Sequence, residues 1–220
     1  EAELSTLRRI GSPEECILVT QGNLAIAYER NGRPEDCLRT WQDIYSRRLE
    51  LFGEENELTL QTANNYAWGL CGLERFEEAK ALLRKPMRVA RRVLGENHEL
   101  TLVLSWAYAR ALYSAEGATL DNLREAVTTL EDAERIARRV LGGAHPTTTM
   151  IDQSLRNARV ALRAREQPSL VVSVAGLQGD EVYFKVNPTT LLQKIFDAYA
   201  NHKGVAGDSL RFLFKGSRVD

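Results

Sequence analysis

The chain has 220 residues, of which 27% are charged and 44% are hydrophobic, with 15 Gly and 6 Pro. This composition is typical of globular proteins and excludes collagen-like and largely disordered chains. The 29 Lys and Arg residues balance 30 Asp and Glu residues, so no excess positive charge draws the whole chain to nucleic acid or to an anionic membrane. No apolar run approaches the ~20 residues that span a bilayer, and residues 1–10 lack the features of a secretory signal. We expect an intracellular protein, cytoplasmic or nuclear, with neither nucleic acid nor membrane as a partner.

The three cysteines, Cys16, Cys37 and Cys71, are odd in number and lie far apart. This spacing predicts neither a disulfide framework nor a zinc site. We expect all three thiols to be reduced and buried. The chain begins with Glu1 rather than Met, which suggests a piece of a longer protein.

A ten-residue pattern recurs along the first 150 residues. Its copies are LFGEENELTL at 51–60, VLGENHELTL at 93–102 and VLGGAHPTTT at 140–149. A weaker copy surrounds Gly11, and the spacing of Gly11, Gly53 and Gly95 is 42 residues. The next spacing, to Gly142, is 47 residues because the polar segment 114–122 carries an insertion. Repeats of this length stack into helical solenoids.

Each repeat is predicted to consist of a helix, a turn and a second helix. Before each glycine, a small and a large residue stand four positions apart on one helix face, namely Cys37 and Trp41, Ala79 and Leu83, and Ala126 and Leu130. The glycine suits the left-handed position that ends a helix, and arginine pairs at 47–48, 91–92 and 138–139 would complement the negative end of the helix dipole. The predicted helices are 16–31, 34–52, 57–72, 76–94, 99–115, 121–141 and 146–166.

The period alone also allows HEAT or armadillo repeats. The segments NLAIAYERNGRPEDCLRTW (23–41) and NYAWGLCGLERFEEAKALL (65–83) nevertheless resemble tetratricopeptide repeats, and the LG-x-x-H-x-x-T connector resembles the kinesin light chain variety of that repeat. The resemblance implies a mainly α chain, with a right-handed α-solenoid of about three and a half repeats in residues 1–167. Pro86 departs from the pattern and is expected to kink its helix.

Solenoids of this type present their first helices on a concave side, where residues not used in packing line a groove. We predict a peptide groove formed by Asn23, Ile26, Asn64, Asn65, Trp68, Trp106, Arg110, Gln153 and Asn157, and we expect Glu29 to face the same groove. Asn can bond a peptide backbone, Trp supplies contact area and Arg binds carboxylates, so the groove suits a short acidic or aromatic peptide. Alternatively, the tryptophans are inter-helix core and the asparagines cap turns.

From Pro168 the hydrophobic period changes from helical to alternating. SLVVSVAG and EVYFKVN predict a β-hairpin across LQGD (177–180). NPTT then opens an amphipathic helix that Thr189 or Thr190 can cap and that ends at Gly204. SLRFLFKG predicts a third strand, with Leu210, Phe212 and Phe214 on one face. Strand, strand, helix, strand is the first part of a β-grasp, so we assign residues 168–220 to a second, small α+β domain.

Residues 174–220 resemble the SUMO family of ubiquitin-like modifiers through VAG-x-x-G, the FKV strand, the helix with Ala-Tyr and RFLFKG. The family's last strands and Gly-Gly have no counterpart before Asp220, so we expect a partial domain. The resemblance implies a groove for a SUMO-interacting motif, formed by Phe184, Lys185, Val186, Thr190, Lys194, Ile195 and Tyr199. Asn187 and His202 stand where the family often has Lys and Arg, which implies weaker selection of acidic ligands. Alternatively, the lysines are plain surface residues, and Val186 and Ile195 are core.

The sequence contains no GxxxxGK[ST], GxGxxG, HExxH or GxSxG motif. His98 and His145 recur at one repeat position, which indicates capping or packing. The arginine pairs could instead form a ridge for phosphate or an acidic partner.

We predict a non-enzymatic interaction scaffold without metal or cofactor, whose partners are proteins or peptides, including proteins with SUMO-interacting motifs. Two alternatives stay open: a kinesin light chain-like cargo adaptor with an incidental tail, and a regulatory fragment of a larger enzyme.

Overall fold

The computed structural model of the chain describes residues 2–166, 170–175, 181–186, 191–205, 212–214 and 217–219. Contacts divide the chain into two compact units, one up to Leu162 and the other from Arg163 onward. The division falls inside the last helix of the repeat region.

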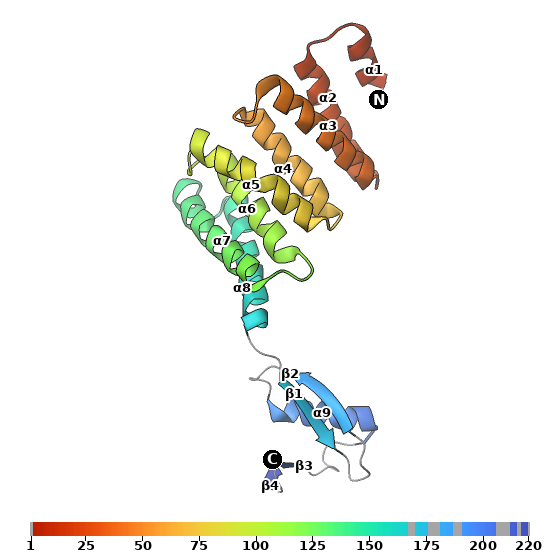
Figure 1. The fold of residues 1–220 in the computed structure, drawn as a ribbon, viewed down its shortest axis with the longest axis vertical. Coiled ribbons are helices and arrows are strands. Elements are labelled where there is room, and N and C mark those ends of the chain that lie inside the picture. The colour runs from red at the N-terminus through yellow and green to blue at the C-terminus, as the bar shows by residue number, and fades with distance from the viewer. Residues whose placement is uncertain are drawn as a thin grey trace. The chain divides into compact units, whose positions relative to one another are not determined.

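The first unit is a stack of helical hairpins (Figure 1). Its helices are α1 (Ala2–Arg9), α2 (Glu14–Arg30), α3 (Pro34–Phe52), α4 (Glu57–Gly72), α5 (Phe76–Val93), α6 (Glu99–Ser114), α7 (Leu120–Val140) and α8 (Pro146–Glu166). Each helix from α2 to α6 packs against the next, and the Arg159–Glu131 ion pair joins α8 to α7. The predicted helices are confirmed, whereas α1 was missed because its eight residues are too few to show a helical period.

The connector glycines have the left-handed backbone that the sequence predicts. Their φ angles are 76° at Gly53, 87° at Gly95 and 89° at Gly142, a region that a side chain would strain. Three residues further on, a polar side chain caps the next helix. The His98 Nδ1 atom accepts the N–H of Leu100 at 3.3 Å. The capping role expected from the recurring histidines is therefore confirmed.

His145 and Asn56 cap the first helices α8 and α4 in the same way. The His145 Nδ1 atom accepts the N–H of Thr147 at 3.3 Å, and the Asn56 Oδ1 atom accepts the N–H of Leu58 at 2.9 Å. Connectors also bind the following repeat: Arg92 pairs with Glu55 at 2.8 Å, and at the equivalent place Arg139 donates to Asn97 at 2.8 Å. The turn and the inter-repeat contact are thus repeated together.

The hydrophobic core of the stack is formed by the small and large residues predicted from the repeat. Ala79, Leu83, Ala126 and Leu130 have no exposed surface, because the small residue lets the helices approach and the large one fills the space between them. Pro86 is buried in the same layer, and α5 continues through it. A pyrrolidine ring there removes the N–H that would bond the preceding turn.

The arginine pairs do not share one position of the repeat. The last turns of α5 and α7 contain such pairs, but the last turn of α3 contains no basic residue. The prediction is therefore wrong for α3, where the pair lies one turn earlier. Arg48 is buried there, and its Nη1 group donates to the carbonyl oxygen of Leu58 at 2.7 Å and to the Thr62 hydroxyl at 2.9 Å. Burial lowers the pKa of Arg48.

In later repeats the equivalent interface is formed by apolar side chains. The residues that correspond to Arg48 and Thr62 are Ala90 and Leu104, and then Ala137 and Ile151, all without exposed surface. The last helix of the stack changes the pattern again. One face of α8 is buried through Ile151, while exposed Thr149 and Arg156 make its other face largely polar. A polar outer helix is typical of the end of a solenoid.

The second unit contains strands β1 (Leu170–Ala175), β2 (Glu181–Val186), β3 (Phe212–Phe214) and β4 (Ser217–Val219), and helix α9 (Leu192–Lys203). β1 pairs antiparallel with β2, with Val172 opposite Phe184, and β3 pairs with β4. The Phe212 ring stacks on Phe196 of α9 with centroids 3.9 Å apart. Gly204 ends α9 in the left-handed conformation, as predicted.

Some expectations for this unit fall outside the described residues. They are the turn at 177–180, the caps at Thr189 and Thr190, and Leu210. α9 begins at Leu192, and β4 was not predicted, because three residues are too short to show alternation.

We expect Arg48→Ala to lower the free energy of unfolding by about 1–3 kcal/mol, because the part-buried Leu58 carbonyl and the buried Thr62 hydroxyl lose a donor. Adding Thr62→Leu reproduces the Ala90 and Leu104 pair of the next repeat and should recover most of that loss. Urea denaturation followed by circular dichroism measures both effects. A double variant no more stable than Arg48→Ala would show that the two interfaces do not pack equivalently.

Candidate functional site

Side chains from alternate helices form one continuous row across the repeat unit. Its members are Glu29 on α2, Trp68 on α4, Trp106 and Arg110 on α6, and Ser154 on α8. The Trp68 Nε1–H donates to the Glu29 carboxylate at 3.3 Å, and the Trp106 Nε1–H donates to the Ser154 hydroxyl at 2.7 Å. The two indole rings stack with centroids 5.7 Å apart. We call these residues the tryptophan row.

A guanidinium group lies against both rings. The Arg110 Cζ atom is 4.6 Å from the centroid of Trp68 and 5.7 Å from that of Trp106. Cations are attracted to the negative face of an aromatic ring, most strongly to indole. Trp68 and Arg110 hold the same place relative to the connector glycines Gly53 and Gly95, so the stacking of repeats brings them side by side.

The two tryptophans have different surroundings. Trp68 is 44% exposed, whereas Trp106 is 5% exposed and its polar edge is bonded within the protein. The sequence left open whether the tryptophans line the groove or form inter-helix core. Trp106 is a core residue, and the Trp68 ring stacks on it. Trp68 presents much of its indole to solvent.

The remaining residues of the predicted peptide groove lie on the same first helices. Asn23 and Ile26 are exposed on α2, and Gln153 and Asn157 are exposed on α8, where the Gln153 amide donates to Asn157 at 3.1 Å. Asn64 and Asn65 are half-buried on α4, and the Oδ1 atom of Asn64 is buried without a hydrogen-bond partner. The helix caps are other residues, so the described hydrogen bonds give Asn64 no capping role.

One member of the row, Ser154, was not predicted from the sequence. Glu29 was expected to face the groove, because it follows Ile26 by three positions on the same helix face. Ser154 carries no such signal, because its role depends on the indole that reaches it from α6. Neither Glu29 nor Arg110 forms an ion pair with another described side chain, although exposed charges elsewhere in the unit do, as in the Arg47–Glu14 pair at 2.8 Å.

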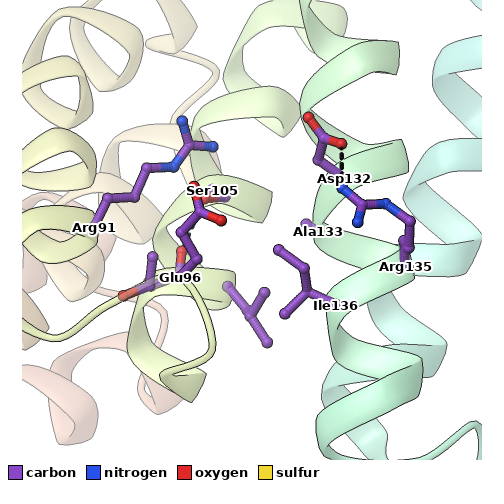
Figure 2. A pocket seen from close by; sticks show the side chains of 9 residues that line it. Arg91, Glu96, Ser105, Asp132, Ala133, Arg135 and Ile136 are labelled. Atoms are coloured by element: carbon purple, nitrogen blue, oxygen red, sulfur yellow. Dashed lines mark hydrogen bonds and ion pairs between the residues drawn. The ribbon is translucent and has the colours of Figure 1, made fainter.

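A polar pocket of about 130 Å³ lies between repeats, away from this row. Figure 2 shows Arg91, Glu96 and Ser105 on one side of it and the ion-paired Asp132 and Arg135 on the other. The preceding interface has an equivalent pocket of about 140 Å³, where Pro86 and Lys85 take the places of Ala133 and Asp132. Since the pocket recurs, we attribute it to the stacking of helices.

Among the described residues, the cysteines and arginines do not form a second candidate binding or catalytic site. Cys37 and Cys71 are buried, and burial raises the pKa of both thiols, which makes them weak nucleophiles. Cys16 is exposed, so the expectation of three buried thiols is wrong for that residue. Arg92 and Arg138 are already bound to carboxylates, which weighs against a ridge of cations open to phosphate.

In the second unit, the predicted SUMO-interacting-motif groove lies along β2 and α9. Phe184 and Val186 are half-buried on one face of β2, while Tyr183 on the other face is 66% exposed. On α9, Ile195 and Tyr199 are buried and Lys194 is exposed. Thr190 and the side chain of Lys185 lie outside the described part of the chain. Within that part, β2 pairs with β1 alone.

Metal-binding clusters and membrane-spanning helices are both absent from the described residues. These residues contain no group of three or more His, Cys, Asp or Glu side chains arranged to hold a metal ion. Among the helices described, none is both long and apolar enough to cross a membrane.

We expect Trp106→Ala to lower the free energy of unfolding by about 3–5 kcal/mol, because it empties a buried ring site and leaves the Ser154 hydroxyl without its donor. Trp68→Ala should cost clearly less, since nearly half of that side chain is already in water. Thermal and urea denaturation of the two variants provide the comparison. Equal losses would mean that Trp68 is as much a core residue as Trp106.

Comparisons with known proteins agree with this architecture. Residues 16–85 match the protein-family model described as "Tetratricopeptide repeat", and residues 170–220 match the one described as "Ubiquitin-2 like Rad60 SUMO-like". A solved structure from Podosopora anserina, described as putative kinesin light chain nearly identical TPR-like repeats, has a TM-score of 0.59 and 22% identity, covering 67% of each chain. A substituted variant of that protein gives a TM-score of 0.60 with the same identity and coverage.

At this identity the structural likeness concerns the fold. The tetratricopeptide match falls on the helical hairpins, and the SUMO-like match follows them in the chain. The chain therefore carries tetratricopeptide repeats with the fold of kinesin light chain-like repeat structures, followed by a SUMO-like segment in which strands and one helix form part of a β-grasp.

Proposed function

We propose that this protein is a non-enzymatic interaction scaffold whose repeat unit binds an extended peptide of a partner protein along its first helices. The observation that carries the proposal is Trp68, whose exposed indole is held by Glu29 at its edge and by Arg110 on its face. Exposed, pre-oriented tryptophans are enriched among the residues that dominate binding energy at protein interfaces. Holding the ring in place reduces the entropy that a ligand must remove.

Polar side chains beside Trp68 suit a peptide backbone. Asn23 and Asn65 occupy the same place in consecutive repeats, on α2 and α4. An amide side chain can accept a backbone N–H and donate to a backbone carbonyl at once. Ile26, which is 39% exposed, adds apolar surface next to this group.

We expect Trp68→Ala to weaken binding of peptides selected from an array of random 12-residue sequences by at least about tenfold, as for an interface residue worth more than about 1.4 kcal/mol. Phe52→Ala is the matched control, because Phe52 is a similarly exposed aromatic residue at the end of a second helix, 41% against 44%. Fluorescence polarisation with the selected peptides measures both variants. Equal weakening by the two substitutions, or no effect of either, would argue against binding at the first helices.

We propose in addition that the second unit recruits proteins with a SUMO-interacting motif by adding the motif as a strand to β2. The match to a SUMO-like family supports this proposal, as does the pairing of β2 with β1 alone among the described strands. A strand edge offers unpaired N–H and C=O groups to an extended peptide. The apolar face of β2 through Phe184 and Val186, and exposed Lys194 on α9, would contact apolar and acidic residues of the motif.

We expect Val186→Asp to abolish binding of a synthetic peptide with four aliphatic residues followed by acidic ones, because a carboxylate would be buried against the apolar strand. Lys194→Glu, at an exposed site that tolerates charge, should weaken the same peptide several-fold. Val171→Asp is the control, since Val171 is 67% exposed on the opposite face of the hairpin. NMR titration reports binding and folding together. Unchanged affinity in the folded Lys194→Glu and Val186→Asp variants would remove this site.

A further inference from the structure

We propose that the tryptophan row selects peptides carrying one basic and one acidic side chain no more than about three residues apart, with an apolar side chain between them. This inference rests on the proposed peptide binding and defines its ligand more narrowly. The sequence alone favours an acidic or aromatic ligand because of its Asn, Trp and Arg110 side chains, although Glu29 is expected to face the same groove. The position of Glu29 changes that expectation.

Charges of opposite sign lie on two sides of the Trp68 ring. The Glu29 carboxylate meets the edge of the indole, and the Arg110 guanidinium lies over its face. Within the described part of the chain, neither charge has an oppositely charged partner in contact. This contrasts with Arg92, Arg138 and Arg159, each of which is paired with a carboxylate. Two opposite charges are thus available to a ligand that covers the ring.

The distances set the spacing of the ligand. The Glu29 oxygen is 3.3 Å from Nε1 of Trp68, and Arg110 is 4.6 Å from the centroid of the same ring. The two charges are therefore separated by at most about 10 Å, which sets an upper limit of roughly three residues of an extended chain at about 3.3 Å each. An apolar side chain between the two charged ones then lies over the exposed indole.

Each protein charge remains able to bond. A guanidinium stacked on an aromatic ring keeps its N–H groups free at the edge, in the geometry that binds a carboxylate with two hydrogen bonds. The Glu29 carboxylate accepts one bond from Trp68 and has lone pairs left for a lysine or arginine. A ligand with acidic groups at both places would bring one of them close to Glu29, where like charges repel and reduce affinity.

The test is a thermodynamic cycle between protein and peptide charges on the full chain. The probes are four synthetic 12-residue peptides built around Lys-Leu-Phe-Asp, with Lys replaced by Gln, Asp replaced by Asn, or Lys replaced by Glu in the other three. We expect the Lys and Asp peptide to bind about three- to tenfold more tightly than each of the others, as is usual for partly exposed charge pairs. Isothermal titration calorimetry at low and at high salt measures these differences, which should shrink as salt screens the charges.

Glu29→Gln and Arg110→Gln complete the cycle. Glu29→Gln keeps an oxygen that can accept the Trp68 N–H, so the ring stays in place, and it should weaken only peptides that contain the lysine. Arg110→Gln should weaken only peptides that contain the aspartate. Asp43→Asn, an exposed change on the second helix α3 with the same effect on net charge as Glu29→Gln, should leave all affinities unchanged.

The outcomes separate this inference from the proposed function. If the doubly acidic peptide binds as tightly as the Lys and Asp peptide, or if Glu29→Gln weakens all four peptides equally, the charge selection is wrong and peptide binding stands. If the wild-type chain binds none of the four probes, and Trp68→Ala alters no affinity on the random array, both proposals fail. Circular dichroism and melting temperatures of the variants confirm that each is folded.

Discussion

The repeat unit depends on how closely its helices can approach one another. Ala79 and Ala126 admit the neighbouring backbone, and Leu83 and Leu130 fill the space one turn away, so that none of the four is exposed. This packing holds successive repeats in one register. Residues about 42 positions apart therefore lie next to each other in space. Side chains from α2, α4, α6 and α8 thus form one continuous row.

Within this constant frame, equivalent positions have diverged. The interface that Arg48 and Thr62 build with hydrogen bonds is built by Ala90 and Leu104 one repeat later. Both versions of the interface are buried. The same divergence produces the candidate site, because Trp68 and Arg110 are different residues at one repeat position.

The second unit would use a different recognition principle. In the proposed function the first helices offer side chains to a ligand, whereas β2 offers the backbone groups of a strand edge. Both would bind extended segments, so a chain with two such surfaces would be suited to bringing partners together.

The sequence by itself determined the repeat, the helices, the glycine turns and the histidine caps, because these depend on local spacing and backbone conformation. It also identified Trp68 and Arg110 as groove candidates. Only the tertiary structure decided that Trp68 is exposed and Trp106 is buried. The burial of Trp106 depends on Ser154 of α8, the first helix of the following repeat, which meets its indole. The tertiary structure likewise brought Glu29 to the edge of Trp68 from a helix 39 positions away. Contacts between repeats arise from the stacking of whole helices, and no local pattern encodes them.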